Sequence, residues 1–387
     1  MKQLLSNSPW GLFIVLVGVF SPMAATAQVS ENGSINENNR TFSDWCLQYD
    51  ELPEATQAAV LFLLENADTE DCYQADQVLA TQTVLGGAFI PIWADFRPFA
   101  SLTEVTAIDL IVGADYSPEI DLTPLNGLPK LTILNVVGEL RNLAPFSVLE
   151  NLHHLILFSN TSRDYPEHDS LAPLASLRNL RTLHIRTRRR IIHDLTPLAN
   201  LKNLEVLTIS SQENIDDLTP LANLTHLNHL SLDSQQIHDL SPLQNLSQLT
   251  FLSLGATEVS DLSPLAELDQ LTRLRVAGAN VSDLSPLQNL SNLQRLDLGG
   301  NQITDITPLT DLTQLEVLRL RKNNICDLQV LANLTQLRAL SLEENPITDL
   351  SPISGLVNLQ YLWLPDDPNL DLSPLDALIQ QGNLAIQ

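Results

Sequence analysis

The sequence has 387 residues and is strongly acidic, with 46 aspartate and glutamate residues against 20 lysine and arginine residues and a formal net charge of −26. Because affinity for nucleic acids depends on positive charge that neutralises phosphates, this balance argues against nucleic acid as the main partner. The cysteines and histidines show neither metal-ligand spacing nor a nucleophile paired with a histidine base. We therefore expect no metal, no cofactor and no enzymatic activity.

The first 27 residues have the features of an export signal. Lys2 supplies a positive charge, residues 11–20 (GLFIVLVGVF) are apolar, and Ala25-Thr26-Ala27 places small residues at a cleavage site. The apolar run is short for a membrane span, although an uncleaved anchor is the alternative. We expect a signal peptide over 1–27, no membrane insertion after cleavage, and a secreted, periplasmic or cell-surface protein in an oxidising compartment.

A cap is expected between the signal and the repeats. Residues 28–40 are polar and predict a disordered leader. Over 41–80 the composition changes, and residues 52–67 (LPEATQAAVLFLLENA) and 69–79 (TEDCYQADQVL) predict two helices. Cys46 and Cys72 both lie in this segment, which has no repeat pattern, and we expect a disulfide between them. Cys326 is left over, and we expect it to be a buried, inert thiol.

The rest of the chain repeats one pattern. From Leu227 to Gln380, seven 22-residue units carry apolar residues at positions 1, 4, 6, 11, 14, 17 and 20, aspartate at position 13 and, in six of them, proline at position 16. Looser copies upstream are marked by the same proline, at Pro98, Pro124, Pro145, Pro173, Pro197 and Pro220. About thirteen coils fit, so we place a repeat domain at 81–380 and a C-terminal tail at 381–387.

The physics of one unit can be derived from its pattern. Apolar positions 4 and 6 between variable neighbours predict a short strand with one buried face. Serine or threonine at position 15 is a good helix N-cap, and proline at 16 suits the first helical position, so a short 3-10 or helical turn should follow. Unit 315–336 has Gln329 and Val330 there, and we expect its cap to be lost. One unit cannot bury its leucines alone, so stacked units form a solenoid.

The motif LxxLxLxxNxIxDLSPLxxL, met almost residue for residue over 293–314, resembles the bacterial leucine-rich repeat family in its 22-residue, internalin-like form. The resemblance implies an α/β solenoid, an arc with short parallel strands on the concave face and 3-10 or short helical turns on the convex face. It also implies an asparagine ladder at position 9, to which only Asn301, Asn323 and Asn345 contribute. Trp45-Cys46, a helix and a second cysteine resemble the N-terminal cap of secreted cyanobacterial leucine-rich repeat proteins.

In such an arc, positions 3, 5 and 7 point to solvent on the concave face. Arg275, Asp297 and Arg319 share position 5 of successive units and can form a ladder of alternating charge. Arg273 and Arg295 are like charges on adjacent strands, which destabilise each other without a partner. The concave arginines form either a site for an acidic protein or glycan or a solvated structural face; they are Arg273, Arg275, Arg295, Arg319 and Arg321.

Two further features have alternative interpretations. Tyr361 and Trp363, at positions 3 and 5 of the last full unit, either anchor a ligand or pack against the C-terminal tail. Two enlarged coils, 158–174 and 186–195, carry insertions that should leave the solenoid on one rim. Their charged residues either neutralise one another or form a recognition loop; these are Arg186, Arg188, Arg189 and Arg190 against Asp164, Glu167 and Asp169.

We therefore predict a monomeric, non-enzymatic, secreted recognition module that binds a protein or an acidic glycan through its concave face. The alternative is an inhibitor or regulatory subunit of one specific extracytoplasmic enzyme or receptor. Fold alone does not decide between them.

Overall fold

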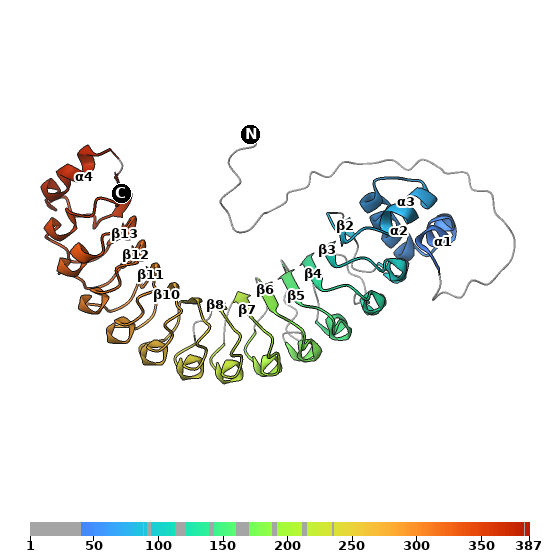
Figure 1. Ribbon diagram of the computed structural model, residues 1–387, viewed down its shortest axis with the longest axis horizontal. Helices are drawn as coiled ribbons and strands as arrows, with labels where there is room; N and C mark the ends of the chain where they lie inside the picture. Colours follow the sequence, from blue (N-terminus) through green and yellow to red (C-terminus); the bar gives the residue numbers. More distant parts are fainter. Residues whose placement is uncertain are drawn as a thin grey trace.

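The computed structural model describes residues 40–87, 89–90, 94–112, 121–138, 143–159, 170–187, 192–210, 215–233, 236–382 and 384–387. The expected signal peptide and all of the leader except Arg40 lie outside the described residues. The repeats form an open arc, with a group of helices at its N-terminal end and a short helix, α4 (Asp376–Gln380), near its C-terminal end (Figure 1). No helix among the described residues is long and apolar enough to cross a membrane.

The N-terminal cap contains α1 (Phe42–Cys46), a 3-10 turn η2 (Tyr49–Glu51), α2 (Glu54–Ala67) and α3 (Cys72–Leu79). The two predicted helices are confirmed as α2 and α3, whereas α1 was not predicted. It is a five-residue helix that starts with a capping box, in which Thr41 and Asp44 each bond the other's backbone amide. Asp71 caps α3, because its Oδ1 accepts hydrogen bonds from the backbone amides of Tyr73 and Gln74, at 2.9 Å each.

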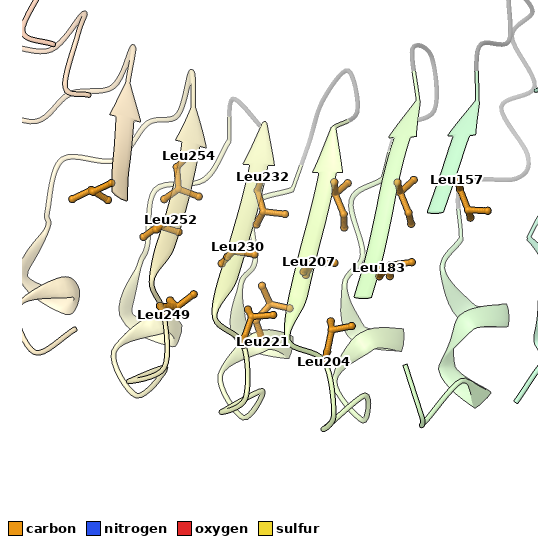
Figure 2. Packing of buried hydrophobic residues seen from close by; sticks show 14 of the residues in the cluster. Leu157, Leu183, Leu204, Leu207, Leu221, Leu230, Leu232, Leu249, Leu252 and Leu254 are labelled. Atoms are coloured by element: carbon orange, nitrogen blue, oxygen red, sulfur yellow. The ribbon is translucent and has the colours of Figure 1, made fainter. Parts of the chain in front are cut away.

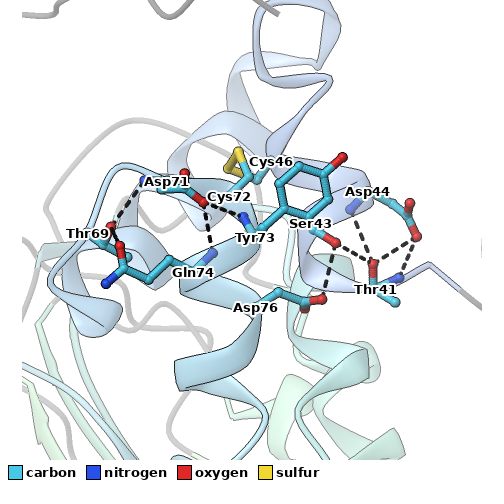
Figure 3. The surroundings of a disulfide bond; sticks show 10 residues. All are labelled: Thr41, Ser43, Asp44, Cys46, Thr69, Asp71, Cys72, Tyr73, Gln74 and Asp76. Carbon is cyan, nitrogen blue, oxygen red and sulfur yellow. Dashed lines mark hydrogen bonds between the residues drawn. A yellow bond between two sulfur atoms is a disulfide. The ribbon is translucent and has the colours of Figure 1, made fainter. Parts of the chain in front are cut away.

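A disulfide joins Cys46, at the end of α1, to Cys72, at the start of α3 (Figure 3). Ser43 Oγ also donates a hydrogen bond to Asp76 Oδ2 at 3.1 Å, so the same two helices are held together twice. The cap is attached to the first coil through Asp95, whose Oδ2 accepts a hydrogen bond from Thr56 Oγ1 of α2 at 2.8 Å. The predicted pairing of the two cysteines is therefore present and ties the cap into one unit.

Fifteen strands of the described chain form one parallel sheet, fourteen of them in chain order and β2 beside β3. Strands β3 to β6 have six residues each, β7 to β10 have five and β11 to β14 have three, whereas β1, β2 and β15 have two. The strands are β1 (Val84–Leu85), β2 (Phe89–Ile90), β3 (Ala107–Val112), β4 (Ile133–Gly138), β5 (His154–Ser159), β6 (Thr182–Thr187), β7 (Val206–Ser210), β8 (His229–Asp233), β9 (Phe251–Gly255), β10 (Arg273–Ala277), β11 (Arg295–Asp297), β12 (Val317–Arg319), β13 (Ala339–Ser341), β14 (Tyr361–Trp363) and β15 (Ala385–Ile386).

The outer side of the arc carries one 3-10 turn per coil, and the thirteen described turns match the expected number of coils. They are η3 (Arg97–Ser101), η4 (Thr123–Gly127), η5 (Ala144–Val148), η6 (Ala172–Ser176), η7 (Thr196–Leu198), η8 (Thr219–Leu221), η9 (Ser241–Leu243), η10 (Ser263–Leu265), η11 (Ser285–Leu287), η12 (Thr307–Leu309), η13 (Gln329–Asn333), η14 (Ser351–Ile353) and η15 (Ser373–Leu375).

The residue that caps these turns differs from the prediction. In the regular units the turn begins at the serine or threonine of position 15, and the leucine before it makes no side-chain cap. The aspartate at position 13 caps the turn instead. Asp239 Oδ1, for example, accepts a hydrogen bond from the Ser241 amide at 2.8 Å. Unit 315–336 keeps its cap because Asp327 bonds the Gln329 amide at 2.9 Å. The expected loss of this cap was wrong, since it assigned the capping role to the wrong position.

The core of the arc is a stack of leucines that lie beneath the strands (Figure 2). Leu230 and Leu232 of β8 are fully buried, as are Leu252 and Leu254 of β9, which confirms that positions 4 and 6 point inward. Burying one such side chain stabilises the fold by about 1.5–3 kcal/mol relative to leaving it in water. Because each leucine packs on neighbours from the next coil, the burial requires stacking.

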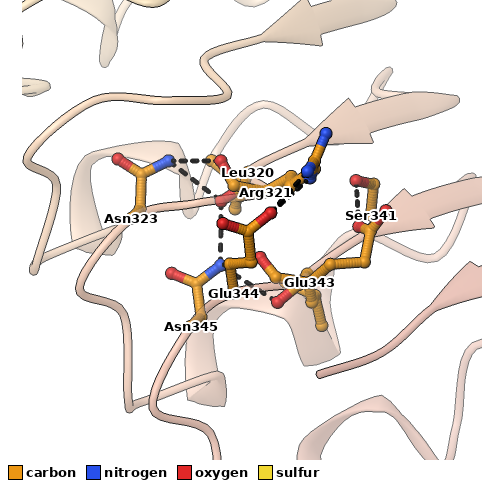
Figure 4. A network of polar contacts seen from close by, with 8 residues as sticks. Leu320, Arg321, Asn323, Ser341, Glu343, Glu344 and Asn345 are labelled. Atoms are coloured by element: carbon orange, nitrogen blue, oxygen red, sulfur yellow. Dashed lines mark hydrogen bonds and ion pairs between the residues drawn. The ribbon is translucent and has the colours of Figure 1, made fainter. Parts of the chain in front are cut away.

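The asparagine ladder is present where the sequence supplies it. Asn323 Nδ2 donates to the carbonyls of Leu298 and Leu320, and its Oδ1 accepts from the Ile303 amide at 3.1 Å. Figure 4 shows the bond from Asn323 to the Leu320 carbonyl. Asn301 and Asn345 repeat this arrangement in the adjacent coils. At the same position Thr257 is buried, and among the described residues its hydroxyl has no hydrogen-bond partner. The ladder is therefore incomplete, as predicted.

Cys326 differs from the expectation. We expected a buried thiol, but the side chain is exposed and forms no disulfide. It occupies position 12 of its unit, between buried Ile325 and exposed Asp327, where the chain turns and side chains point to solvent. The thiol is thus accessible.

Candidate binding surface on the concave face

The concave face is built by side chains at fixed positions of successive strands. Parallel pairing keeps these positions in register, so Arg273 of β10 stands between Phe251 of β9 and Arg295 of β11. Neighbouring strands lie about 4.8 Å apart, which places residues of equal position side by side. We call the residues in register with position 3 of the repeat the first row and those in register with position 5 the second row. Leu274, between Arg273 and Arg275, is buried and separates the two rows.

Three of the predicted arginines are occupied by intramolecular partners. In the second row, Arg275 Nε and Arg319 lie 3.5 and 3.9 Å from Asp297 Oδ2, which is the charge ladder that the sequence allowed. Arg321 Nε donates to Glu344 Oε1 at 2.9 Å (Figure 4). All three guanidinium groups are exposed, so these ion pairs contribute little to stability.

Arg273 and Arg295 are different. They are exposed, directly opposite each other in the first row of β10 and β11, and neither forms an ion pair with any described residue. Two like charges in this arrangement repel each other unless an anion neutralises them. The structure therefore brings these two predicted residues together as a positive pair whose charge has no partner within the described part of the chain.

An aromatic stack that the sequence reasoning missed lies beside this pair. The rings of His229 and Phe251, in the first row of β8 and β9, are 4.0 Å apart between centroids and 3° from parallel. Phe251 is directly beside Arg273. Four successive first-row residues thus form two stacked rings followed by two cations. The 22-residue period already places all four at position 3, and this alignment would have revealed them.

The imidazoles on this face are held neutral at pH 7. Burial, together with the nearby His184 and Arg273, lowers the pKa of His229 to about 4. Burial also lowers the pKa of His184, helped by His154, and burial lowers the pKa of His154, helped by His153. The middle of the concave face therefore carries no histidine charge at neutral pH.

A second missed feature lies nearer the cap, on β3 to β5. Ile111 and Val137 are 38% and 43% exposed, which is unusual for such side chains when they stand next to one another. Phe158 follows Val137 in register and is half-buried. Half-buried Ile133 and Ile156 lie on the same strands, β4 and β5, in the first and second rows. We call this group the apolar concave cluster: Ile111, Ile133, Val137, Ile156 and Phe158.

The signal for this cluster was in the sequence. Strands β3 to β5 read AIDLIV, ILNVVG and HLILFS, with apolar residues at solvent-facing positions as well as at buried ones. A strand that needs only one buried face should alternate apolar and polar residues. The excess of apolar residues over 107–158 therefore indicates a second surface that avoids water.

Tyr361 and Trp363 lie at the other end of the face. Trp363 Nε1 donates to Gln387 Oε1 at 2.8 Å, because β15 adds the C-terminal residues to the sheet beside β14. Tyr361 remains 50% exposed, and its ring centroid is 6.0 Å from that of Trp363. Tail packing thus occurs for Trp363. Two strands, β12 and β13, separate these aromatics from Arg295, so the structure does not join them to the arginine pair.

The charged residues of the two insertions lie mostly outside the described part of the chain. Arg188, Arg189 and Arg190 and the three acidic residues expected near them lie outside the described residues. Arg186 alone is described; it is exposed and stands beside Phe158 in register. Among the described residues there is no group of histidine, cysteine and carboxylate side chains that could hold a metal ion. The described part of the concave face therefore presents a positive pair, an aromatic stack and an apolar cluster.

This geometry can be compared with known proteins. The model for the family Leucine Rich repeats (2 copies) matches residues 269–311 and 291–333. The internalin InlF from Listeria monocytogenes str. 4b F2365 shares 29% sequence identity and a TM-score of 0.70, over 86% of this chain and 94% of InlF. The chain therefore carries leucine-rich repeats and is similar in sequence and in fold to an internalin. This confirms both the family resemblance and the solenoid fold that the repeats predicted.

Two other solved structures resemble this internalin-like protein in fold. The functional domain of InlJ from Listeria monocytogenes has 21% identity and a TM-score of 0.57, over 90% of this chain and 80% of that chain. The ectodomain of the Arabidopsis thaliana receptor kinase GASSHO1/SCHENGEN3 was solved in complex with CASPARIAN STRIP INTEGRITY FACTOR 2. It has 20% identity and a TM-score of 0.53, over 72% of this chain and 38% of that chain. Comparison with curated proteins finds no match. The likeness of the cap to cyanobacterial proteins stays a prediction.

Proposed function

We propose that this internalin-like protein is a secreted, non-enzymatic recognition module that binds a protein through its concave face. The observation that carries the proposal is the positive pair, Arg273 and Arg295, which has no acidic partner among the described residues and adjoins the His229–Phe251 stack. Arginine and aromatic side chains are the residue types that dominate binding energy at interfaces. An exposed like-charge pair costs stability, which a bound anion would offset.

Three observations support the wider proposal. The apolar concave cluster lies on the same face, and exposed apolar patches mark protein contacts. The InlF likeness covers 86% of this chain, and a leucine-rich repeat ectodomain of the same fold was solved with a bound partner. The signal-like residues 1–27 and the Cys46–Cys72 disulfide agree with export into an oxidising compartment.

An acidic glycan is the second candidate ligand. Sugar rings pack on aromatic side chains, and uronic or sulfate groups pair with arginine, so the His229–Phe251 pair beside Arg273 favours it. An inhibitor or regulatory subunit would use the same face but would hold one enzyme or receptor tightly.

The test is binding of mature protein, residues 28–387, to arrays of extracellular proteins and of glycans. The site variant is Arg273→Glu/Arg295→Glu. The matched control is Arg178→Glu/Lys202→Glu, which makes the same change in net charge at exposed positions outside the strands. We expect the wild type to bind protein ligands, the site variant to bind them at least about tenfold more weakly, and the control to bind them with unchanged affinity.

The outcomes separate the candidates. Binding only to glycans supports the second candidate, and one saturating enzyme or receptor target supports the inhibitor. Protein ligands that survive the charge reversal, and also survive Ile111→Ser/Val137→Ser, would show that the concave face is not the binding surface.

A further inference from the structure

The concave face has a polarised charge pattern that specifies its partner more closely. From β4 to β9, the first and second rows contain no lysine, arginine, aspartate or glutamate. Their residues are aliphatic, hydroxyl, amide, phenyl or imidazole side chains: Ile133, His154, Thr182, Val206, His229 and Phe251 in the first row, and Asn135, Ile156, His184, Thr208, Ser231 and Ser253 in the second. In a chain with a net charge of −26, a neutral track six strands long is distinctive.

The borders of the track do not change this. Arg181 and Glu205 lie just before the first row on β6 and β7, and they form an ion pair of 2.6 Å with each other. The three imidazoles on the track are neutral at pH 7, as shown above. Arg186 of β6 is exposed at position 7 beside Phe158, outside these two rows. Within the first and second rows, the first positive charges without an ion pair among the described residues are therefore Arg273 on β10 and Arg295 on β11.

The two ends of the track are held at a fixed separation. The apolar concave cluster is centred on β4, and the positive pair begins on β10, six strand steps away. At about 4.8 Å per step this is on the order of 30 Å along the sheet. An extended chain covers that distance in about nine residues, at about 3.3 Å per residue.

This pattern favours a protein over an acidic glycan. A sulfated or uronic glycan carries anionic groups along its whole length, so most of them would lie over the neutral track, desolvated and without a cation. A protein segment can place apolar side chains at one end and carboxylates at the other. Such a segment would satisfy the apolar concave cluster and the positive pair together.

We propose that the partner is a protein with an extended acidic segment whose charge is confined to one end. Apolar side chains would contact the apolar concave cluster, and at least two carboxylates about nine residues away would pair with Arg273 and Arg295. An apolar or aromatic side chain next to these carboxylates would pack on the His229–Phe251 stack. The proposal rests on the proposed function and adds the order and spacing of the partner's chemical groups.

The test uses the folded mature protein and synthetic peptides as probes. The matched peptide has Leu-Phe-Ile at one end, a spacer of glutamine and serine, and Phe-Asp-Glu at the other, with about nine residues between the two groups. A shortened peptide has a spacer of about three residues, an interleaved peptide distributes the same acids along its length, and an inverted peptide carries lysine in place of the acids. A heparin oligosaccharide provides the glycan probe. Affinity is measured by fluorescence anisotropy up to millimolar peptide.

We expect the matched peptide to bind at least about tenfold more tightly than the other three, and increasingly weakly as salt is raised. The Arg273→Glu/Arg295→Glu variant should reverse the preference and select the inverted peptide, which a merely unfolded variant could not do. Ile111→Ser/Val137→Ser, at exposed positions, should weaken the matched and inverted peptides alike.

Equal binding of matched, shortened and interleaved peptides, or failure of the charge reversal to exchange the preference, would overturn the proposal. So would heparin binding that depends on Arg273 and Arg295 while the peptides do not differ. These results leave the proposed function standing if array proteins still lose affinity in the same variant. If no array protein binds the concave face, the proposed function fails together with this inference.

Discussion

Asp327 Oδ1 accepts a hydrogen bond from the Gln329 amide at 2.9 Å, and this bond caps the turn η13 in the unit that has no Ser-Pro or Thr-Pro pair. In other units the same bond is accompanied by a proline, which fixes φ at the start of the turn. The aspartate therefore caps turns with and without a proline, and the proline further restricts the backbone where it is present.

We expect Asp327→Ala to destabilise the protein by about 1–2 kcal/mol, the upper part of the range for a lost cap. Asp305→Ala should cost less, because Pro308 still restricts the backbone of its turn. Urea unfolding midpoints and amide exchange in residues 329–333 provide the measurement. Asp327→Asn keeps an oxygen acceptor and serves as the control; equal costs for Asp327→Ala and Asp305→Ala would contradict the argument.

Asn323 supplies hydrogen bonds to two coils at once. Its side chain satisfies the carbonyls of Leu298 and Leu320 and the amide of Ile303, all in the interior. Asn323→Ala leaves these buried groups without partners, so we expect a loss of about 2–4 kcal/mol in the free energy of unfolding. The reverse change, Ala279→Asn, should extend the ladder by one coil and raise the urea midpoint. A neutral Asn323→Ala would mean that the ladder follows the fold without stabilising it.

The 22-residue period of the sequence predicted the features that recur in every unit, and few others. It placed the leucines of positions 4 and 6, the thirteen coils and the Arg275–Asp297–Arg319 ladder correctly, since each depends only on position within the unit. It misplaced the cap because Ser at 15 and Asp at 13 are both good capping residues, and only backbone geometry distinguishes them. Cys326 was judged as a residue type, although polar residues at position 12 of other units, such as His238 and Ser260, indicate exposure.

Surface features were harder for a related reason. The His229–Phe251 stack depends on side chains from two strands, and it becomes visible only when units are aligned in register. The apolar concave cluster lies in the loose copies, where insertions shift the spacing and hide the register between Val137 and Phe158. A periodic core is thus predictable from one unit, whereas a binding surface is a property of neighbours.

The disulfide should matter mainly for the cap. It closes a sequence separation of 26 residues, and in the chain-entropy view a loop of this length contributes about 3–3.5 kcal/mol. We expect Cys46→Ser/Cys72→Ser to loosen α1 and α3 while the repeats stay folded, because each coil is stabilised mainly by its neighbours. Limited proteolysis should then cleave within residues 40–80 first. Cys326→Ser, at an exposed free thiol, is the control and should change nothing; simultaneous loss of the whole arc in the double variant would contradict the prediction.

His229 should make stability depend on pH. Its ring lies half-buried in the first row, where burial, together with the nearby His184 and Arg273, lowers the pKa from an ordinary value of 6.5 to about 4. The unfolded chain therefore takes up this proton at a higher pH than the folded protein does. The contribution of His229 is complete above about pH 7, falls as the pH decreases from 6.5 towards 4, and changes no further below that value.

A shift of one pKa unit corresponds to about 1.4 kcal/mol, and solvent reduces the effect for a half-buried ring, so we expect a loss of about 1–2 kcal/mol. Urea midpoints of the wild type and of His229→Asn, compared at about pH 7.5 and about pH 4.5, isolate it. This window lies above the range of the turn-capping aspartates, such as Asp305, whose pKa is lowered by hydrogen bonds from the side chain and backbone of Thr307. We expect His229→Asn to lose part of the pH dependence and the exposed control His226→Asn to keep it, because only His229 must give up solvent to occupy its place beside Phe251. If both variants follow the wild-type curve, the ring at 229 takes up its proton as readily in the folded protein as in the unfolded chain, and the track would then carry a charge at β8 at acid pH.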